Sequence, residues 1–71
     1  MIGELVAARN ALGMNQEQLA KAWGRRQTII ARIETYERRI DVVELVTLCE
    51  ILIVDPVELI QRLKADIFPN R

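Results

Sequence analysis

Residues 16–35 read QEQLAKAWGRRQTIIARIET, and the spacing of apolar residues in this stretch decides the fold. Apolar or small residues recur at helical intervals on both sides of Gly24, which predicts two short helices joined by a tight turn. Asn15 and Gln18 stand three residues apart at the start of the first helix, in the pattern of a capping box. We therefore expect the first helix to start at Asn15 and to end at Gly24.

The second helix of the pair, expected over about residues 26–36, has two different sides. Ile30 and Ile33 share one side at 100° per residue. They hold this helix against the first one, where Ala20 is small enough to let the two helices cross. The opposite side collects polar and small residues, with Ile29 on its border: Gln27, Thr28, Ala31, Arg32 and Thr35. A helix held in this way projects a polar face, which the major groove of B-DNA, about 12 Å wide, can accept.

Three further helices follow from the rest of the chain. Helical spacing predicts one over residues 2–12, and a capping-box pattern at Asp41 and Glu44 starts another. Asp55 followed by Pro56 starts the last. The residues expected to face the core from these helices are Ile2, Leu5, Val6, Leu12, Leu45, Leu48, Cys49, Leu52, Leu59, Ile60, Leu63 and Ile67. The predicted fold class is all-α, a compact bundle of five short helices.

The length of 71 residues predicts a single domain, 1–71, in which residues 16–35 carry the motif and about 41–67 complete the core and dimerise. The chain has no histidine and one cysteine, Cys49, which excludes imidazole catalysis, internal disulfides and Cys/His zinc sites. We therefore expect no enzymatic activity, no metal and no cofactor. No apolar run approaches the ~20 residues of a membrane span, and no signal-peptide pattern is present, so we expect a cytoplasmic protein without membrane contact.

The formal net charge is zero, but the charges are unevenly distributed. Five of the ten basic residues lie within residues 25–39. Residues 41–60 carry five acidic residues and no basic one. This asymmetry predicts a polarised surface, one side of which suits phosphate groups.

Four strings of the sequence resemble the helix-turn-helix domain of the phage repressor, Cro and Xre-like regulator family. They are LGMNQEQLA (12–20), GRRQTIIARIE (24–34), ERRIDVVEL (37–45) and VDPVEL (54–59). Matching residues run from Leu5 to about Leu63, nearly the whole chain. The resemblance implies a lambda repressor-like fold, double-stranded DNA as the partner, and a prokaryotic or phage-encoded regulator.

The resemblance also implies roles for individual side chains. The side chains that reach base edges in the major groove are Gln27, Thr28 and Arg32. Two neighbouring side chains touch thymine methyl groups, Ile29 and Ala31. Six others contact the sugar-phosphate backbone: Gln16, Arg25, Arg26, Thr35, Arg38 and Arg39. Arg9 and Glu34 match a pair that ties the first helix to the third, so we expect them to be structural.

The sequence departs from this family at two positions. Tyr36 and Ile53 stand where the family usually has glycine, after the third and the fourth helix. A residue with a Cβ is strained at positive φ, and a β-branched one more so. We therefore expect these two helices to end differently here, or to run on further than usual.

The fourth helix, its exit and the tail hold more apolar residues than one inner stripe uses. The residues concerned are Val42, Val46, Ile51, Ile53, Val54, Ile67 and Phe68. Surplus apolar surface on a small domain predicts a partner, here a second copy of the chain. Such a homodimer would bind a palindromic site whose half-sites lie about 34 Å apart.

The leading hypothesis is a sequence-specific DNA-binding regulator, a transcriptional repressor that occupies its operator. Two alternatives stay open. The first keeps the same DNA-binding mode in an antitoxin, with a toxin as protein partner, or in a restriction-modification controller. The second is a helix-turn-helix scaffold reused for protein–protein contact, which the zero net charge and the acidic segment 41–60 favour and the polar outer face with its arginines disfavours.

Overall fold

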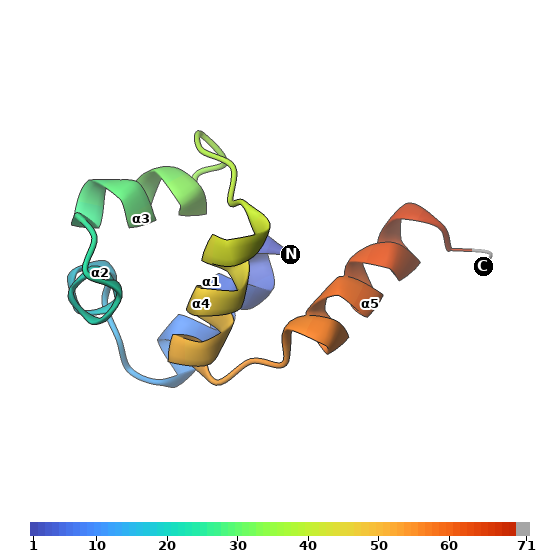
Figure 1. Ribbon diagram of the computed structural model, residues 1–71, viewed down its shortest axis with the longest axis horizontal. Coiled ribbons are helices and arrows are strands. Elements are labelled where there is room, and N and C mark those ends of the chain that lie inside the picture. The colour runs from blue at the N-terminus through green and yellow to red at the C-terminus, as the bar shows by residue number, and fades with distance from the viewer. Residues whose placement is uncertain (70–71) are drawn as a thin grey trace.

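The structure, a computed structural model that describes residues 1–69, has five helices and no strand within those residues (Figure 1). Their bounds are α1 Ile2–Ala11, α2 Gln16–Trp23, α3 Gln27–Glu34, α4 Val42–Leu52 and α5 Pro56–Ile67. The predicted all-α fold of five short helices is confirmed. α3 is shorter than the expected 26–36, because Arg26 is its N-cap and Thr35 its C-cap.

Three of the helices begin at the caps that the sequence predicts. At α2, Asn15 Oδ1 accepts a hydrogen bond from the Gln18 amide, and Gln18 Oε1 accepts one from the Asn15 amide, both at 2.8 Å. Asp41 and Glu44 form the same reciprocal pair at α4, at 2.7 and 3.1 Å. Asp55 caps α5 through one backbone amide. These bonds satisfy amides that have no partner inside the helix.

The first four helices end with the same turn. In each, a backbone amide donates to the carbonyl five residues earlier, across a residue with positive φ. The donor and acceptor residues are Met14 and Arg9 (3.1 Å), Arg25 and Ala20 (2.9 Å), Glu37 and Arg32 (2.8 Å), and Val54 and Cys49 (2.9 Å). The residues with positive φ in these turns are Gly13, Gly24, Tyr36 and Ile53.

Tyr36 and Ile53 thus adopt the conformation that glycine adopts elsewhere in the chain, with φ of 65° and 58°. The expectation that α3 and α4 end differently or run on is wrong. The turn keeps its hydrogen bonds, although an L-residue in this region costs about 1–2 kcal/mol. The two residues are 75% and 81% exposed, so packing within the described residues does little to offset that strain.

Replacing Tyr36 or Ile53 by glycine is expected to raise the free energy of unfolding by about 1 kcal/mol each. The relief of strain exceeds the additional backbone entropy that glycine loses on folding. Chemical denaturation followed by circular dichroism measures the change.

Gly24→Ala is the matched control for this pair of variants. Gly24 has φ 74°, and a Cβ built on it meets nothing within 4 Å, so an alanine there introduces strain without a clash. It should lower the free energy of unfolding by about 1–2 kcal/mol. A destabilised Tyr36→Gly variant beside a destabilised Gly24→Ala variant contradicts the assignment of strain to Tyr36.

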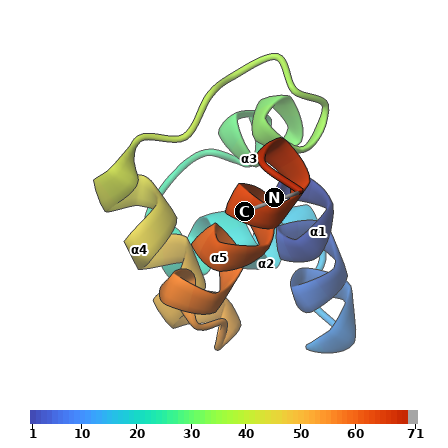
Figure 2. The ribbon, with the colours of Figure 1, turned by 90° about the vertical axis from the view of Figure 1, so that its right-hand side faces the viewer.

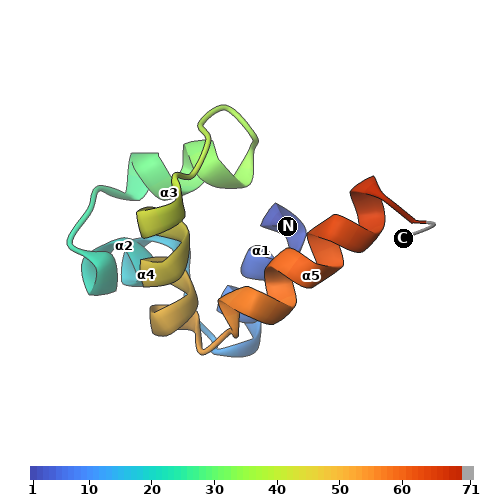
Figure 3. The ribbon, with the colours of Figure 1, turned by 45° about the vertical axis from the view of Figure 1, so that its right-hand side comes forward.

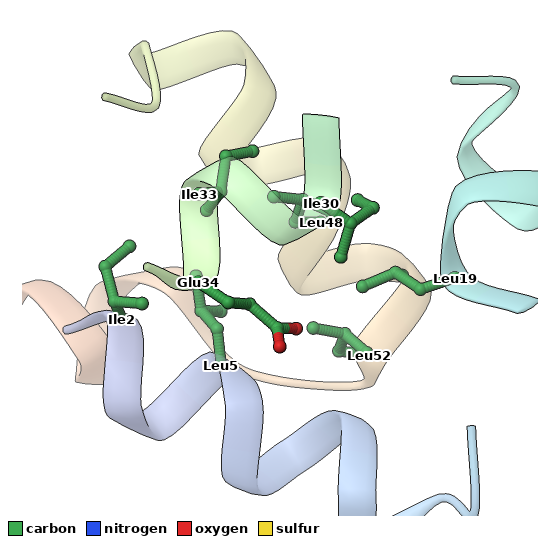
Figure 4. Close-up of a pocket in the computed structure, with 8 residues that line it drawn as sticks. All are labelled: Ile2, Leu5, Leu19, Ile30, Ile33, Glu34, Leu48 and Leu52. Atoms are coloured by element: carbon green, nitrogen blue, oxygen red, sulfur yellow. The ribbon is translucent and has the colours of Figure 1, made fainter. Parts of the chain in front are cut away.

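α4 supplies the largest share of the hydrophobic core. The buried core residues are Leu5 from α1, Leu19 and Ala20 from α2, Ile30 and Ile33 from α3, Leu45, Leu48, Cys49 and Leu52 from α4, and Leu59 from α5. Burial raises the pKa of the Cys49 thiol, so this side chain packs as a small apolar group. A cavity of about 20 Å³ remains among α1, α2, α3 and α4, large enough for one water molecule at most (Figure 4).

α5 leaves the body formed by the other four helices. Figures 1 and 3 show it running outward from the end of α4, which gives the molecule extents of 39 × 23 × 20 Å. Leu59 is buried and Leu63 half-buried, but Ile60 and Ile67 are exposed. The expectation that all four face the core is therefore wrong for Ile60 and Ile67, which are exposed to solvent. The expectation of a core-facing side chain is also wrong for Leu12 after α1, which is 44% exposed. Within residues 1–69, no helix has the length and apolar character to cross a membrane.

Candidate nucleic-acid interface

α3 lies at the edge of the body, with α2 beneath it and the α3–α4 loop arching away from its end (Figures 1 and 2). Its inner side buries Ile30 and Ile33, as the sequence predicts. Thr28 and Arg32 are exposed on the outer side. Within the part of the chain that the structure describes, neither of these two side chains has a hydrogen-bond or ion-pair partner. The described face of α3 is therefore polar, exposed and open to a ligand.

A chain of hydrogen bonds runs from α1 through Glu34 to the start of α3. Arg9 donates from Nε and Nη2 to the two Glu34 carboxylate oxygens, at 2.7 and 2.9 Å. Gln16 Nε2 donates to Glu34 Oε1 at 2.9 Å, and Gln27 Nε2 donates to Gln16 Oε1 at 2.7 Å. Figure 4 shows the Glu34 carboxylate reaching in among apolar core side chains, where an unpaired charge would be costly. The Arg9–Glu34 contact thus joins α1 to the end of α3.

These hydrogen bonds determine which polar atoms of Gln16 and Gln27 remain available to a ligand. Gln16 is half-buried and already uses its carbonyl oxygen and one of its two N–H groups. One N–H remains for a phosphate. Gln27 is also half-buried, and its bond to Gln16 leaves its carbonyl oxygen and one N–H, the pair that can contact adenine. The bond between the two glutamines fixes the orientation of Gln27 before any ligand binds.

The start of α2 offers backbone donors beside Gln16. The capping box uses the amides of Asn15 and Gln18, which leaves those of Gln16 and Glu17 pointing out of the helix end. A shallow depression of about 410 Å³ lies at this end, lined by Arg9, Asn15, Gln16 and Glu17. Backbone amides at a helix N-terminus suit an anion such as phosphate.

The other side chains that we expect to contact the DNA backbone differ in whether they already have a hydrogen-bond partner. Arg26 and Arg39 are exposed, and their side chains have no partner among residues 1–69. Thr35 is exposed too, but its hydroxyl donates to the carbonyls of Ala31 and Arg32, at 3.0 and 3.3 Å. Its single hydrogen is thus used within its own helix. Ile29 and Ala31 are half-buried on the border of the exposed face.

Arg25 and Arg38 share a carboxylate that sequence reasoning placed only in a cap. Glu44 Oε1 and Oε2 accept from Arg38 Nη1 and Nη2, at 3.2 and 2.7 Å. Arg25 Nη1 lies 3.8 Å from Glu44 Oε2, and its guanidinium stands 4.8 Å from the centre of the Trp23 ring. Glu44 is only 8% exposed, so it belongs to the interior. No local pattern distinguishes a buried capping glutamate from an exposed one.

These contacts hold the pKa of Glu44 below its ordinary value. The hydrogen bond from Arg38 is the main cause, followed by the one from the Asp41 amide. The same ion pair raises the pKa of Arg38. Because the folded pKa is the lower one, Glu44 stabilises the fold above the ordinary glutamate pKa. That contribution is lost as the pH falls through the lowered value.

A model of helix-turn-helix proteins matches residues 5–59, from the first helix to the buried Leu59 of α5. The chain belongs to the helix-turn-helix family. No curated protein and no solved structure gives a significant match. The family, of the Xre, Cro and C1 kind, comprises DNA-binding regulators that are typically not enzymes, and membership supports double-stranded DNA as the partner of this helix-turn-helix protein. Within residues 1–69 no cluster of His, Cys, Asp and Glu is arranged to hold a metal.

Proposed function

We propose that this helix-turn-helix protein is a transcriptional repressor that inserts α3 into the major groove of its operator. The observation that carries the proposal is the exposed outer side of α3, where Thr28 and Arg32 have no partner in the described chain. Arg can donate twice to guanine O6 and N7, and Thr can contact a base edge or a thymine methyl group. Gln27, held by Gln16, adds an amide suited to adenine.

Side chains around this face would fix the register on the duplex. Arg26 precedes α3 as its N-cap, Arg39 follows α3 in the α3–α4 loop, and both are exposed. The free amides at the start of α2 add a third contact, next to Gln16. Contacts to phosphates orient a protein but carry little sequence information. Specificity is therefore assigned to Gln27, Thr28 and Arg32.

We assign dimerisation to the apolar residues of α4 and α5 and the segments that follow them. Val46, Ile53 and Ile67 are exposed, and so is Phe68. Ile51 and Val54 are half-buried against the core, so they would contribute only their outer surfaces. A two-fold dimer would present two copies of α3 to half-sites about 34 Å apart.

Replacing Arg32 by alanine is expected to weaken binding to a cognate duplex, obtained by selection from a random pool, by about 1–3 kcal/mol. The loss should be confined to one base position in each half-site, because only the bidentate contact to that base disappears. A titration of duplexes that differ at single positions measures the change.

Arg62→Ala provides the matched control. It removes the same charge from α5, where Arg62 pairs with Glu4 and Glu58, away from α3. Its binding should stay close to that of the wild type on every duplex. Equal losses for Arg32→Ala on cognate and unrelated duplexes would show that Arg32 contacts phosphate and reads no base.

A further inference from the structure

Glu44 connects the two segments that flank the recognition helix. Arg25 lies in the turn before α3, Arg38 lies in the loop after it, and both guanidinium groups meet the same carboxylate. Glu44 itself is fixed in the first turn of α4, because its Oε1 also accepts the Asp41 amide at 3.1 Å. One side chain of α4 thus sets the positions of basic groups at both ends of α3.

The two arginines remain accessible although they are held. Their side chains are 44% and 33% exposed, whereas that of Glu44 is 9% exposed. Arg25 is further restrained by the Trp23 ring, and Arg38 by a bond of 3.3 Å to the Arg39 carbonyl. A guanidinium has five N–H donors in one plane, and contact with a single carboxylate leaves several of them unused. Both groups can therefore donate to a phosphate while they stay bound to Glu44.

Restraint of this kind favours binding. A free arginine loses side-chain entropy when a ligand orders it, and a side chain already held in place loses less. The negative charge that does the holding is buried, so it is remote from a ligand that approaches from solvent. The exposed ends of the three-residue cluster are both positive.

We propose that Glu44 is a positioning residue that holds Arg25 and Arg38 in the geometry needed to contact the DNA backbone on either side of the inserted α3. The inference rests on the proposed function. Glu44 touches no nucleotide itself and acts through the two arginines. The contacts that it organises are to phosphate, so its contribution is independent of base sequence.

Glu44→Gln tests this proposal because a purely electrostatic effect and the loss of arginine positioning would change DNA affinity in opposite directions. Glutamine can still close the capping box at α4. Removing a negative charge from a DNA-binding protein tightens binding through simple electrostatics. If Glu44 positions the arginines, the variant should instead bind cognate and unrelated duplexes about 3- to 10-fold more weakly. The slope of log affinity against log salt should become shallower by about one.

Glu50→Gln is the matched control, with the same charge change on an exposed residue further along α4. Its affinity and salt slope should equal those of the wild type or rise slightly. Tighter binding by Glu44→Gln, with a steeper slope, overturns the proposal, since the carboxylate would then compete with phosphate. Arg25→Ala adds a second readout: it should weaken binding in the wild type and much less in Glu44→Gln. Equal losses in both backgrounds overturn the proposal as well.

The outcomes also separate this inference from the proposed function. A wild-type protein that binds no selected duplex contradicts both. A wild type that binds specifically, beside a Glu44→Gln variant with unchanged affinity and slope, contradicts the positioning role alone. If thermal unfolding shows Glu44→Gln to be unfolded at the assay temperature, the variants Arg25→Ala and Arg38→Ala test the proposal in its place. Uniformly weaker binding and a shallower slope in each support the proposal, and unchanged binding in both overturns it.

Discussion

Replacing Arg9 by alanine is expected to lower the free energy of unfolding by about 3 kcal/mol, the lower end of the range for breaking a buried ion pair. Arg9 makes three hydrogen bonds, two to Glu34 and one of 2.7 Å to the Met14 carbonyl. Its loss leaves the Glu34 carboxylate among apolar side chains with Gln16 as its remaining donor. A domain of this size gains only about 3–5 kcal/mol from its core, so the variant should retain about 0–2 kcal/mol of stability, with up to about half of the molecules unfolded at 25 °C.

Arg62→Ala makes this a controlled comparison. Arg62 also pairs with glutamates, Glu4 and Glu58, but its side chain is 56% exposed against 11% for Arg9. An exposed pair contributes about 0–1 kcal/mol, so its removal should leave stability nearly unchanged. Urea denaturation of both variants measures the difference. Losses of similar size would mean that burial does not set the strength of the Arg9 pair.

The starts of α2, α4 and α5 were predictable because their signals are local. Asn15 and Gln18, or Asp41 and Glu44, form their bonds within three residues, so the sequence contains both partners of each cap. Gly24 marks its turn for the same reason, since its backbone freedom belongs to the residue itself. The spacing of apolar residues then identified the buried side of α3.

Interactions between distant residues were only partly predictable. Arg9 and Glu34 could be paired from the family resemblance, which carries tertiary information. Gln16 bonds with residues 11 and 18 positions away, and nothing around Gln16 indicates that its amide faces inward. Glu44 reads as an ordinary capping residue, and only the folded chain shows that it also holds Arg25 and Arg38.

In the strained turns after α3 and α4, the folded chain overrides the local preference of the residue. Tyr36 and Ile53 are locally unfavourable in a left-handed conformation, so local reasoning predicted other helix ends. The chain makes the turn at these positions because the hydrogen bonds from Glu37 and Val54 and the packing of the flanking helices require it. Both residues are exposed, Tyr36 just after α3 and Ile53 between α4 and α5, next to the surfaces proposed above for DNA binding and for dimerisation. Strain of this kind is often retained where a residue serves a ligand or partner.

The helix α5 shows that the spacing of apolar residues does not predict which of them are buried. Spacing correctly predicted an amphipathic helix, but it could not show how much of the apolar side the rest of the body covers. Of the residues of α5, all of which the structure describes, Leu59 is the buried one. Leu59 is 1% exposed, whereas the adjacent Ile60 is 49% exposed. Leu59 is therefore the fully buried contact of α5 with the core, and its neighbour faces outward.

Leu59→Ala is accordingly expected to lower the free energy of unfolding by about 2–5 kcal/mol, through lost burial and the cavity left in the core. Ile60→Ala removes side-chain atoms from the next residue, yet should change the stability of the monomer by about 0.5 kcal/mol or less. If the outer side of α5 forms the proposed dimer contact, Ile60→Ala should instead shift the sedimentation profile toward monomer. Denaturation at several protein concentrations separates the two effects, because dimerisation makes apparent stability depend on concentration. Unchanged sedimentation with Ile60→Ala would move the dimer contact away from α5, and a stability loss equal to that of Leu59→Ala would mean that α5 packs by both sides.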